Sequence, residues 1–180
     1  NPDLTSKPIP WDTGSILFAG RIEKYKGLGV LIEAMKILQK TSATCKLIVA
    51  GRGPDLLVNR SELESIGAEI VDDFLPSAEF HALFDRANVV VMPYIDATQS
   101  GIAAMAIGHA RPTVASAVGS LPEIVINGFN GVVVPPGNAV ELASAILSII
   151  VDGSVAQQYS TNAKELADGA ISPRACAQKL

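Results

Sequence analysis

Two basic side chains near the start of the sequence are placed where they could bind an anion. Arg21 and Lys26 follow a short apolar run, residues 15–19, that ends at Gly20. A planar guanidinium and a compact ammonium close together suit the oxygen atoms of a diphosphate. In the alternative interpretation, both are ordinary surface charges, as we expect for Lys24. Their position directly after an apolar run favours the phosphate-binding interpretation.

A loop of small residues is the second candidate for an anion site. The apolar run 88–92 leads into Pro93 and this loop, which then opens a helix of small and apolar residues. The loop consists of Ala97, Thr98, Gln99, Ser100 and Gly101. Backbone N–H groups at a helix N-terminus have no partner inside the helix, so the loop could bind a negative group. The alternative is that Thr98 or Ser100 only caps the helix.

Both candidates lie in a sequence where apolar runs alternate with amphipathic segments. The runs predict six strands, at residues 15–19, 46–50, 68–71, 89–92, 112–116 and 131–134. Apolar residues at helical spacing between the runs predict the connecting helices. Strands that alternate with helices require right-handed crossovers and a parallel sheet. We therefore predict an α/β fold, a doubly wound six-stranded parallel sheet that is Rossmann-like, with helices on both faces.

The expected strand order brings the two candidate sites together. In the order 3-2-1-4-5-6 the first and fourth strands are neighbours, and ligands bind outside the carboxyl ends of the strands where the order reverses. The loop with Arg21 and Lys26 follows the first strand, and the loop at 97–101 follows the fourth. We expect the two loops to meet, which favours a binding site over the separate alternatives.

Helix ends give further expectations. Ser77 is expected to cap the helix that follows it. Asn138 and Glu141, three residues apart, predict a capping box at the start of a later helix. A last helical stretch is expected from about Ser154 to Ala167.

The composition excludes several classes of protein. The 180 residues are 48% hydrophobic but only 5% aromatic, which predicts an aliphatic core. Lys and Arg number 14 against 18 Asp and Glu, without a basic stripe, so nucleic acid is not an expected partner. No apolar run reaches the length of a membrane span. Cys45 and Cys176 are isolated, so we predict unpaired thiols in a reducing cytoplasm, and neither a metal nor a cofactor.

A nicotinamide cofactor is specifically disfavoured. The G-x-G-x-x-G motif should follow the first strand, but the loop that starts at Gly20 reads GRIEKY. Residues 51–53, GRG, follow the second strand and lack the third glycine, and no Walker A motif is present. His81 and His109 are predicted to be structural, with His109 near a helix end, where it complements the helix dipole.

The length is that of a single domain with a sizeable core. We predict one domain over residues 1–180, with a polar lead at about 1–14, a core at 15–150 and C-terminal helices at 151–180. Because the chain begins without Met, on a polar and Pro-rich lead, we expect it to be a piece of a longer protein.

An ordered series of short motifs carries a resemblance to a known family. The motifs are Phe18-Ala19-Gly20-Arg21 with Lys26-Gly27, the segments 47–53, 87–93, 111–115, 119–125 and 127–131, and Pro135. Together, over about residues 15–150, they resemble the C-terminal domain of the retaining GT-B glycosyltransferases of family 4, glycosyl transferases group 1. The ordered series is far more specific than any one motif.

The resemblance implies a domain that forms one half of a GT-B fold and binds a nucleotide-diphosphate sugar. A separate N-terminal acceptor domain, outside this sequence, would complete the enzyme and could associate peripherally with a membrane. The whole protein would transfer the sugar to an acceptor with retention, in the synthesis of a polysaccharide or glycoconjugate. The 180-residue chain alone would transfer no sugar.

The resemblance also implies roles for single residues. By motif, Arg21 and Lys26 would hold the diphosphate and stabilise it as it leaves. Gly20 and the backbone of residues 98–101 would approach the phosphates and the sugar. The turn at Phe74 and Leu75 would meet the base.

The sequence departs from the family pattern at two positions. The family usually carries two glutamates eight positions apart, one for the sugar and one for the ribose, and those positions here are Ala97 and Met105. The loop resembles a family variant that reads A-T-Q-S-G, and Asp96 could replace the carboxylate on the sugar side. The missing glutamates leave two alternatives open: a non-catalytic sugar-nucleotide-binding or scaffold domain, and a GT-B-type sugar-nucleotide epimerase.

Overall fold

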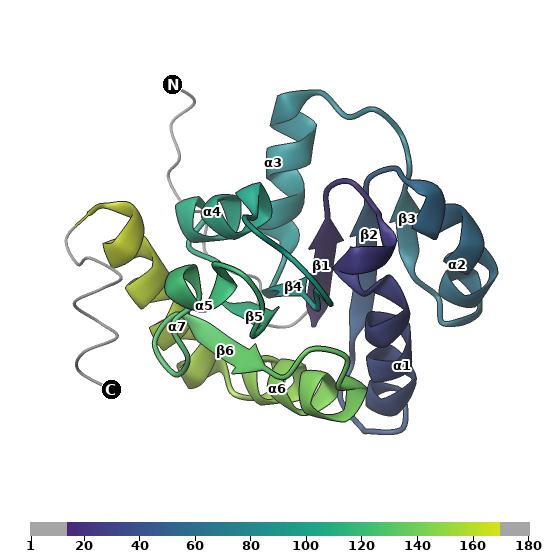
Figure 1. Ribbon diagram of the computed structural model, residues 1–180. Helices are drawn as coiled ribbons and strands as arrows, with labels where there is room; N and C mark the ends of the chain where they lie inside the picture. Colours follow the sequence, from purple (N-terminus) through teal and green to yellow (C-terminus); the bar gives the residue numbers. More distant parts are fainter. Residues whose placement is uncertain (1–13, 170–180) are drawn as a thin grey trace.

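The computed structural model describes residues 14–169, which form one parallel sheet covered by helices on both faces (Figure 1). The strands are β1 (Ser15–Ala19), β2 (Lys46–Ala50), β3 (Glu69–Val71), β4 (Val89–Met92), β5 (Thr113–Ser116) and β6 (Gly131–Val134). Their order is β3-β2-β1-β4-β5-β6, and every pair is parallel. The predicted doubly wound six-stranded sheet is confirmed, including the adjacency of β1 and β4.

The strands form where the sequence has unbroken apolar runs. β1 and β4 are buried along their whole lengths, as expected for central strands that are covered on both faces. Ile16 of β1 pairs with Leu47 of β2 on one side and with Val89 of β4 on the other. β3 lies at the edge, and its three residues are only half-buried.

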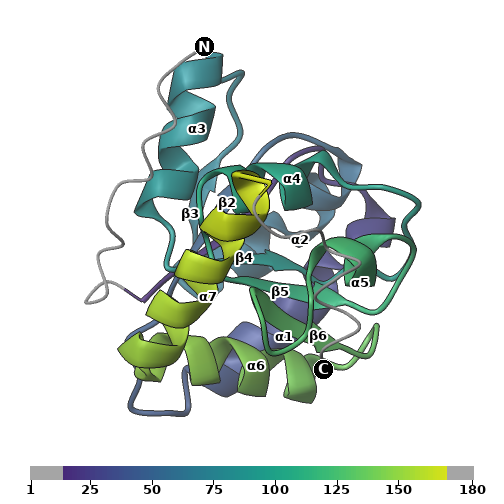
Figure 2. The ribbon, with the colours of Figure 1, turned by 90° about the vertical axis from the view of Figure 1, so that its left-hand side faces the viewer.

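Seven α-helices and one 3₁₀ helix connect and cover the strands within the described residues. They are η1 (Lys24–Lys26), α1 (Leu28–Leu38), α2 (Pro54–Ser65), α3 (Ser77–Arg86), α4 (Gly101–Gly108), α5 (Leu121–Ile124), α6 (Ala139–Val151) and α7 (Gly153–Ala167). Figures 1 and 2 show α1 and α6 on one face of the sheet and α3 and α4 on the other.

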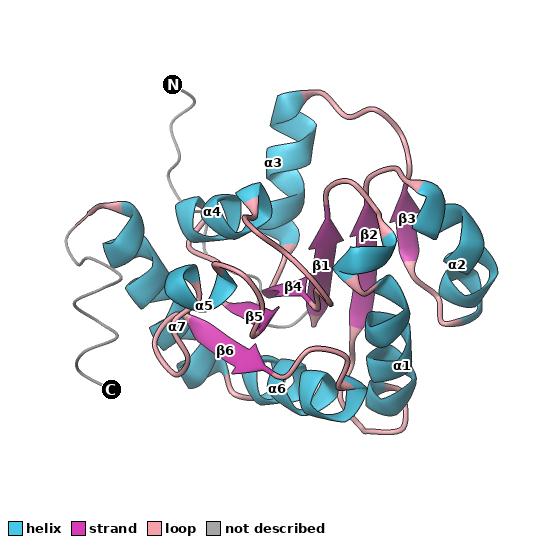
Figure 3. Cartoon of the chain, in the orientation of Figure 1, coloured by secondary structure: helices cyan, strands magenta, loops and turns pink. Residues whose placement is uncertain are grey.

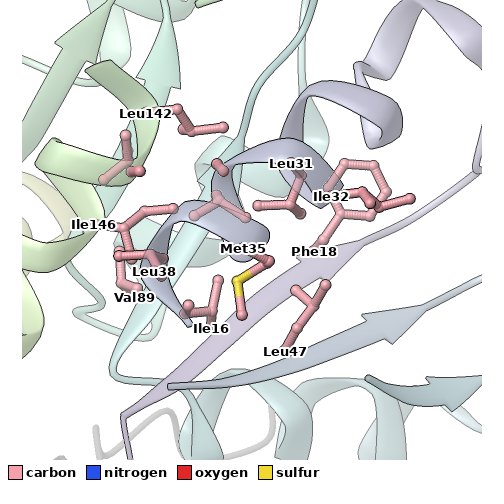
Figure 4. Close-up of a cluster of buried hydrophobic side chains, with 14 of the residues drawn as sticks. Ile16, Phe18, Leu31, Ile32, Met35, Leu38, Leu47, Val89, Leu142 and Ile146 are labelled. Atoms are coloured by element: carbon pink, nitrogen blue, oxygen red, sulfur yellow. The ribbon is translucent and has the colours of Figure 1, made fainter. Parts of the chain in front are cut away.

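The core has two layers, one on each face of the sheet. Figure 4 shows the layer under α1 and α6, where Phe18 of β1 and Leu47 of β2 lie against Leu31 and Met35 of α1. The opposite layer contains Met92, Tyr94 and Ile102 and packs under α3, α4 and α5. Both layers are mainly aliphatic, as the composition predicts.

Helix α7 leaves the face of α6 and packs against both α6 and α4 (Figure 2). Within the described residues, no single helix is long and apolar enough to span a membrane. The pair α6 and α7 together has the length and composition of a span, but the two helices are bent by 95° at the break between them.

The helix ends show one confirmed prediction and one wrong one. The side chain of Asn138 caps α6 by accepting a hydrogen bond from the Glu141 N–H at 3.0 Å, and its amide also donates to the Glu141 carboxylate. The predicted Ser77 cap is wrong: α3 starts one residue earlier than expected, Pro76 is its N-cap, and no side chain caps it. The polar lead before residue 14 and Cys176 lie outside the described residues.

The loops that follow the strands gather at one edge of the sheet. Figure 3 shows the loops after β1, β2 and β3 at this carboxyl edge. The β1 and β4 loops are in direct contact, because the N–H of Ile95 donates to the carbonyl of Tyr25 at 2.7 Å. The loop after β2 joins them, since the N–H of Ile22 donates to the carbonyl of Arg52 at 2.8 Å. The predicted meeting of the two candidate loops is confirmed.

Candidate functional site

The ammonium group of Lys26 lies at the carboxyl edge between the β1 loop and α4. Lys26 ends the short helix η1 and is only 7% exposed. A Cβ atom at Gly20 would lie 2.9 Å from Lys26 Nζ and 3.2 Å from Ile102 Cδ1 of α4. Gly20 also has φ of +101°, a conformation that residues with a side chain rarely adopt. A glycine here lets the ammonium lie directly over the backbone.

The Lys26 ammonium packs on an aromatic ring. Its Nζ lies 5.2 Å from the centre of the Tyr94 ring, within the range of a cation–π interaction. Within residues 14–169, Lys26 forms no ion pair with a carboxylate. Burial lowers the pKa of Lys26 below the ordinary value for lysine. A buried cation without an anionic partner is suited to bind an anionic ligand.

The N-terminus of α4 lies next to this cation. Ser100 is the N-cap residue, and its hydroxyl accepts a hydrogen bond from the N–H of Ala103. The loop before it is anchored by Ser120, whose N–H and hydroxyl both donate to the carbonyl of Thr98. The Thr98, Gln99 and Gly101 positions are exposed. Ser100 does cap the helix, as in the simpler alternative, and its hydroxyl serves one of the first-turn N–H groups that have no partner inside the helix.

A cleft of about 570 Å³ opens beside Gly20. The residues that line it come from the loops after β1, β2 and β3 and from α3: Gly20, Arg21, Gly51, Arg52, Asp73, Phe74, Leu75 and Phe80. Two arginines and exposed aromatic carbon therefore share one concave surface. Four residues predicted from the sequence, Gly20, Arg21, Phe74 and Leu75, line this same cleft.

Arg21 and Lys26 occupy different environments. The side chain of Arg21 is 81% exposed and forms an ion pair with Glu23 at 2.8 Å, whereas Lys26 is buried. Both belong to the β1 loop, and Gly20 lies between the cleft that Arg21 lines and the ammonium of Lys26. An exposed guanidinium and a buried ammonium can approach one ligand from two sides.

The positions of the two missing glutamates are apolar in the structure as well. The side chains of Ala97 and Met105 are partly buried and pack against the core layer under α4. Asp96 is exposed in the β4 loop, and its N–H makes a long hydrogen bond of 3.4 Å to the carbonyl of Tyr25. Asp96 is thus the carboxylate nearest in sequence to the Ala97 position.

The two histidines form a structural cluster away from the cleft. His81 Nδ1 lies 2.8 Å from His109 Nε2, and His109 Nδ1 lies 2.9 Å from the carboxylate of Asp85. The His109 ring also stacks on Phe84. These contacts join α3 to the C-terminal end of α4. Within the described residues, no group of three or more His, Cys, Asp or Glu side chains is placed to hold a metal ion.

Sequence reasoning missed four residues of this region. The Tyr94 ring lies under the Lys26 ammonium, Tyr25 packs against Tyr94, and Arg52 and Phe80 line the cleft. The sequence could have indicated Tyr94 as a site residue, because Tyr94 directly follows Pro93 at the carboxyl end of a central strand. The direction of a side chain after a strand end depends on tertiary packing, so the sequence could not show that its ring faces Lys26.

A doubly wound parallel sheet with a basic cleft at its carboxyl edge is the architecture of Rossmann-like domains. Residues 13–152 match the sequence model of the family described as Glycosyl transferases group 1. The chain therefore belongs to this family of glycosyltransferases.

Individual relatives agree with this family. Glycogen synthase from Mycobacterium tuberculosis is 31% identical over 153 residues, which cover 83% of this chain and 37% of the relative. The chain thus spans less than half the length of this relative.

Solved structures show the same fold. Anabaena HepE, in complex with UDP and glucose, superposes with a TM-score of 0.75 at 20% identity, over 93% of this chain and 47% of that one. The C-terminal domain of a glycosyl transferase group 1 family protein, LpcC from Francisella tularensis, superposes with a TM-score of 0.74 at 23% identity and covers 91% of this chain and 88% of that domain. The fold is that of one half of a GT-B glycosyltransferase.

Proposed function

We propose that this chain is the donor-binding domain of a retaining glycosyltransferase and that it binds the nucleoside diphosphate part of a sugar nucleotide. The observation that carries the proposal is Lys26, a buried ammonium without a carboxylate partner in the described residues, beside the N-terminus of α4. The complexes of HepE with UDP and with UDP-glucose support a nucleotide-diphosphate sugar as the ligand class.

In this proposal the diphosphate lies over Gly20. Lys26 would bind one phosphate as a fixed point charge, and Arg21 would exchange Glu23 for the other phosphate. The exposed N–H groups of α4 would bind the remaining oxygens. Sugar transfer with retention requires that the departing diphosphate be stabilised, and these cations and the helix dipole supply that stabilisation.

The nucleoside would lie in the cleft of about 570 Å³. Phe74 is 87% exposed there, which is unusual for a large apolar side chain and is explained if a base covers it. Arg52 is held at the same cleft by a hydrogen bond of 2.7 Å from its Nε to the carbonyl of Asp72. A ribose between this cleft and α4 would connect the base to the diphosphate.

A second domain would complete the transferase. Tyr25, Phe74 and Ile95 are large apolar side chains exposed in the loops of the carboxyl edge. The chain spans 37% of the glycogen synthase relative, so the acceptor would be bound by residues outside this sequence. Closure of two domains over the donor would orient the reactants and exclude water.

Titration calorimetry on the 180-residue chain tests the binding proposal. UDP, GDP and ADP are compared with uridine, guanosine and adenosine. We expect one diphosphate to bind at least about tenfold more tightly than its own nucleoside, because each hydrogen bond to a charged group contributes about 1.5–3 kcal/mol. Equal affinities for a diphosphate and its nucleoside, or no binding of any diphosphate, would contradict the proposal.

The second candidate is a non-catalytic sugar-nucleotide-binding or scaffold domain. It is favoured by Ala97 and Met105, whose apolar side chains pack against the core where the family usually has glutamates. The two candidates are distinguished by incubating a labelled sugar nucleotide with the protein that contains both domains. Transfer to an acceptor or to water supports the transferase, whereas tight binding without either reaction supports the scaffold.

A further inference from the structure

We propose that Tyr94 is a positioning residue of the diphosphate site. The face of its ring orients the Lys26 ammonium, a role that a carboxylate often has for a buried lysine. This inference rests on the proposed function of the same site. Nothing in the family motifs marks Tyr94, and the proposal comes from its contacts in the structure.

The first observation is the packing of the cation on the ring. Lys26 Nζ lies 5.2 Å from the ring centre, and Tyr94 is only 2% exposed. Because both side chains are buried, water competes little with the attraction between the ammonium and the negative face of the ring. Burial lowers the pKa of Lys26, and the negative face of the ring gives the ammonium a favourable contact in this desolvated position.

The second observation is that the β1 loop holds the Tyr94 ring and its backbone in place. Tyr25 packs edge-on against Tyr94, with ring centres 6.2 Å apart and an angle of 80° between the rings. The carbonyl of Tyr25 accepts the hydrogen bond from Ile95, the residue after Tyr94. Gly27, the residue after Lys26, has φ of +70° and lies so close to the carbonyl of Pro93 that a Cβ atom would collide with it. The helix that carries Lys26 and the loop that carries Tyr94 are therefore held against each other.

The third observation links the ring to the helix start. The Tyr94 hydroxyl lies 3.4 Å from the hydroxyl of Ser100, which is the N-cap of α4. One side chain thus touches both groups that the proposed diphosphate needs, the cation and the first turn of α4. Burial raises the pKa of Tyr94, which keeps the phenol neutral beside the anionic ligand.

An aromatic ring and a carboxylate would affect the charge of the Lys26 ammonium differently. A carboxylate beside Lys26 would neutralise it, and a phosphate would have to compete with that ion pair. The ring orients the ammonium through its quadrupole and adds no formal negative charge. A phosphate that approaches Lys26 therefore has no carboxylate to displace from the ammonium within the described residues.

A fluorination series at position 94 tests the proposal without changing the shape of the core. Tyr94→Phe and the same variant with one, two and three ring fluorines are titrated with the diphosphate that binds most tightly and with its nucleoside. Fluorine withdraws electrons from the ring and weakens a cation–π interaction stepwise. We expect the phenylalanine variant to bind the diphosphate within about threefold of the native chain, because the hydroxyl contact at 3.4 Å is long. Across the series we expect a stepwise loss of about three- to tenfold.

A matched series in the Lys26→Ala background separates the inference from the proposed function. There, fluorination should leave diphosphate affinity unchanged, and nucleoside affinity should stay constant in both backgrounds. If Lys26→Ala weakens diphosphate binding but fluorination does not, Tyr94 does not position the cation and the proposed function stands. If Lys26→Ala itself has no effect on diphosphate binding, the proposed function fails and the inference fails with it. If Tyr94→Phe alone loses as much affinity as the trifluorinated variant, the hydroxyl acts rather than the ring, which also overturns the inference.

Discussion

The ammonium of Lys26 lies directly over Gly20, so close that a Cβ atom at Gly20 would be 2.9 Å from its Nζ. This relationship ties the backbone at the end of the first strand to the cation of the proposed diphosphate site. It explains why a glycine stands there, because both the positive φ of +101° and the position of the ammonium require the absence of a side chain.

Gly20→Ala should therefore displace the ammonium and strain the backbone. We expect diphosphate affinity to fall about tenfold, as for the loss of one charged hydrogen bond, and the free energy of unfolding to fall by about 1–3 kcal/mol. Titration calorimetry and urea unfolding measure the two effects. Gly29→Ala is the matched control, since a Cβ atom there meets nothing within 4 Å, and it should leave affinity unchanged. Native affinity in Gly20→Ala would show that the ammonium does not need this space.

The lowered pKa of Lys26 predicts how binding depends on pH. A bound diphosphate stabilises the ammonium form of Lys26, so the pKa of Lys26 rises on binding. At a pH where part of the free protein has a neutral Lys26, binding is therefore accompanied by the uptake of a proton. Affinity should accordingly begin to fall with rising pH below 10.5, the ordinary value for lysine. Calorimetry in two buffers with different ionisation enthalpies measures the proton uptake. Lys26→Ala should abolish it, whereas Lys24→Ala, on the exposed side of η1, should not. Proton uptake that persists in Lys26→Ala would assign the effect to another group.

The Met105 position tests where the ribose lies. If the ribose approaches α4 as the resemblance implies, Met105→Glu supplies an acceptor for its hydroxyls and should strengthen binding about tenfold. The gain should be lost with the 2′,3′-dideoxynucleoside diphosphate. Met105→Leu keeps an apolar side chain of similar size and serves as the control. A correctly folded Met105→Glu variant with unchanged affinity would place the ribose elsewhere.

The histidine cluster predicts a contribution to stability. His109→Leu would remove the contacts that join His109 to Asp85 and to His81, while Arg111 would remain as an ion-pair partner of Asp85. We expect a cost of about 1–3 kcal/mol in the free energy of unfolding. Urea unfolding monitored by circular dichroism measures the change, with the exposed Lys40→Ala as the control. A variant as stable as the native chain would show that the cluster does not hold α3 to α4.

The sheet could be predicted from the sequence because central parallel strands are buried on both faces. Runs such as Val89–Met92 have no polar alternation, and the predicted strand order, which is that of the usual six-stranded doubly wound sheet, is confirmed. The Asn138 cap was equally visible, because a capping residue acts within its own helix turn. The predicted Ser77 cap was wrong because Ser77 is already the first residue of α3 and Pro76 occupies the N-cap position.

The side-chain environment of the site was much less predictable. Arg21 and Lys26 are alike in the sequence, yet one is exposed with Glu23 and the other is buried against Tyr94. That difference arises from contacts between the β1 and β4 loops, about 70 residues apart in the chain, which no local pattern encodes. The sequence showed that residues 97 and 105 are not acidic, but it could not show that the Ala97 and Met105 side chains are partly buried against the core.

The most direct test of the account is the removal of one charge at Lys26. Lys26→Ala and Lys24→Ala each delete one cation from the same short helix, η1, but only Lys26 lies at the start of α4. Titration calorimetry compares each variant with the native chain for the tightest nucleoside diphosphate and for its nucleoside, at two salt concentrations. We expect Lys26→Ala to lose about tenfold or more in diphosphate affinity with nucleoside affinity unchanged, and Lys24→Ala to keep both. Equal loss for diphosphate and nucleoside, or equal diphosphate affinity in the two variants, would contradict the account.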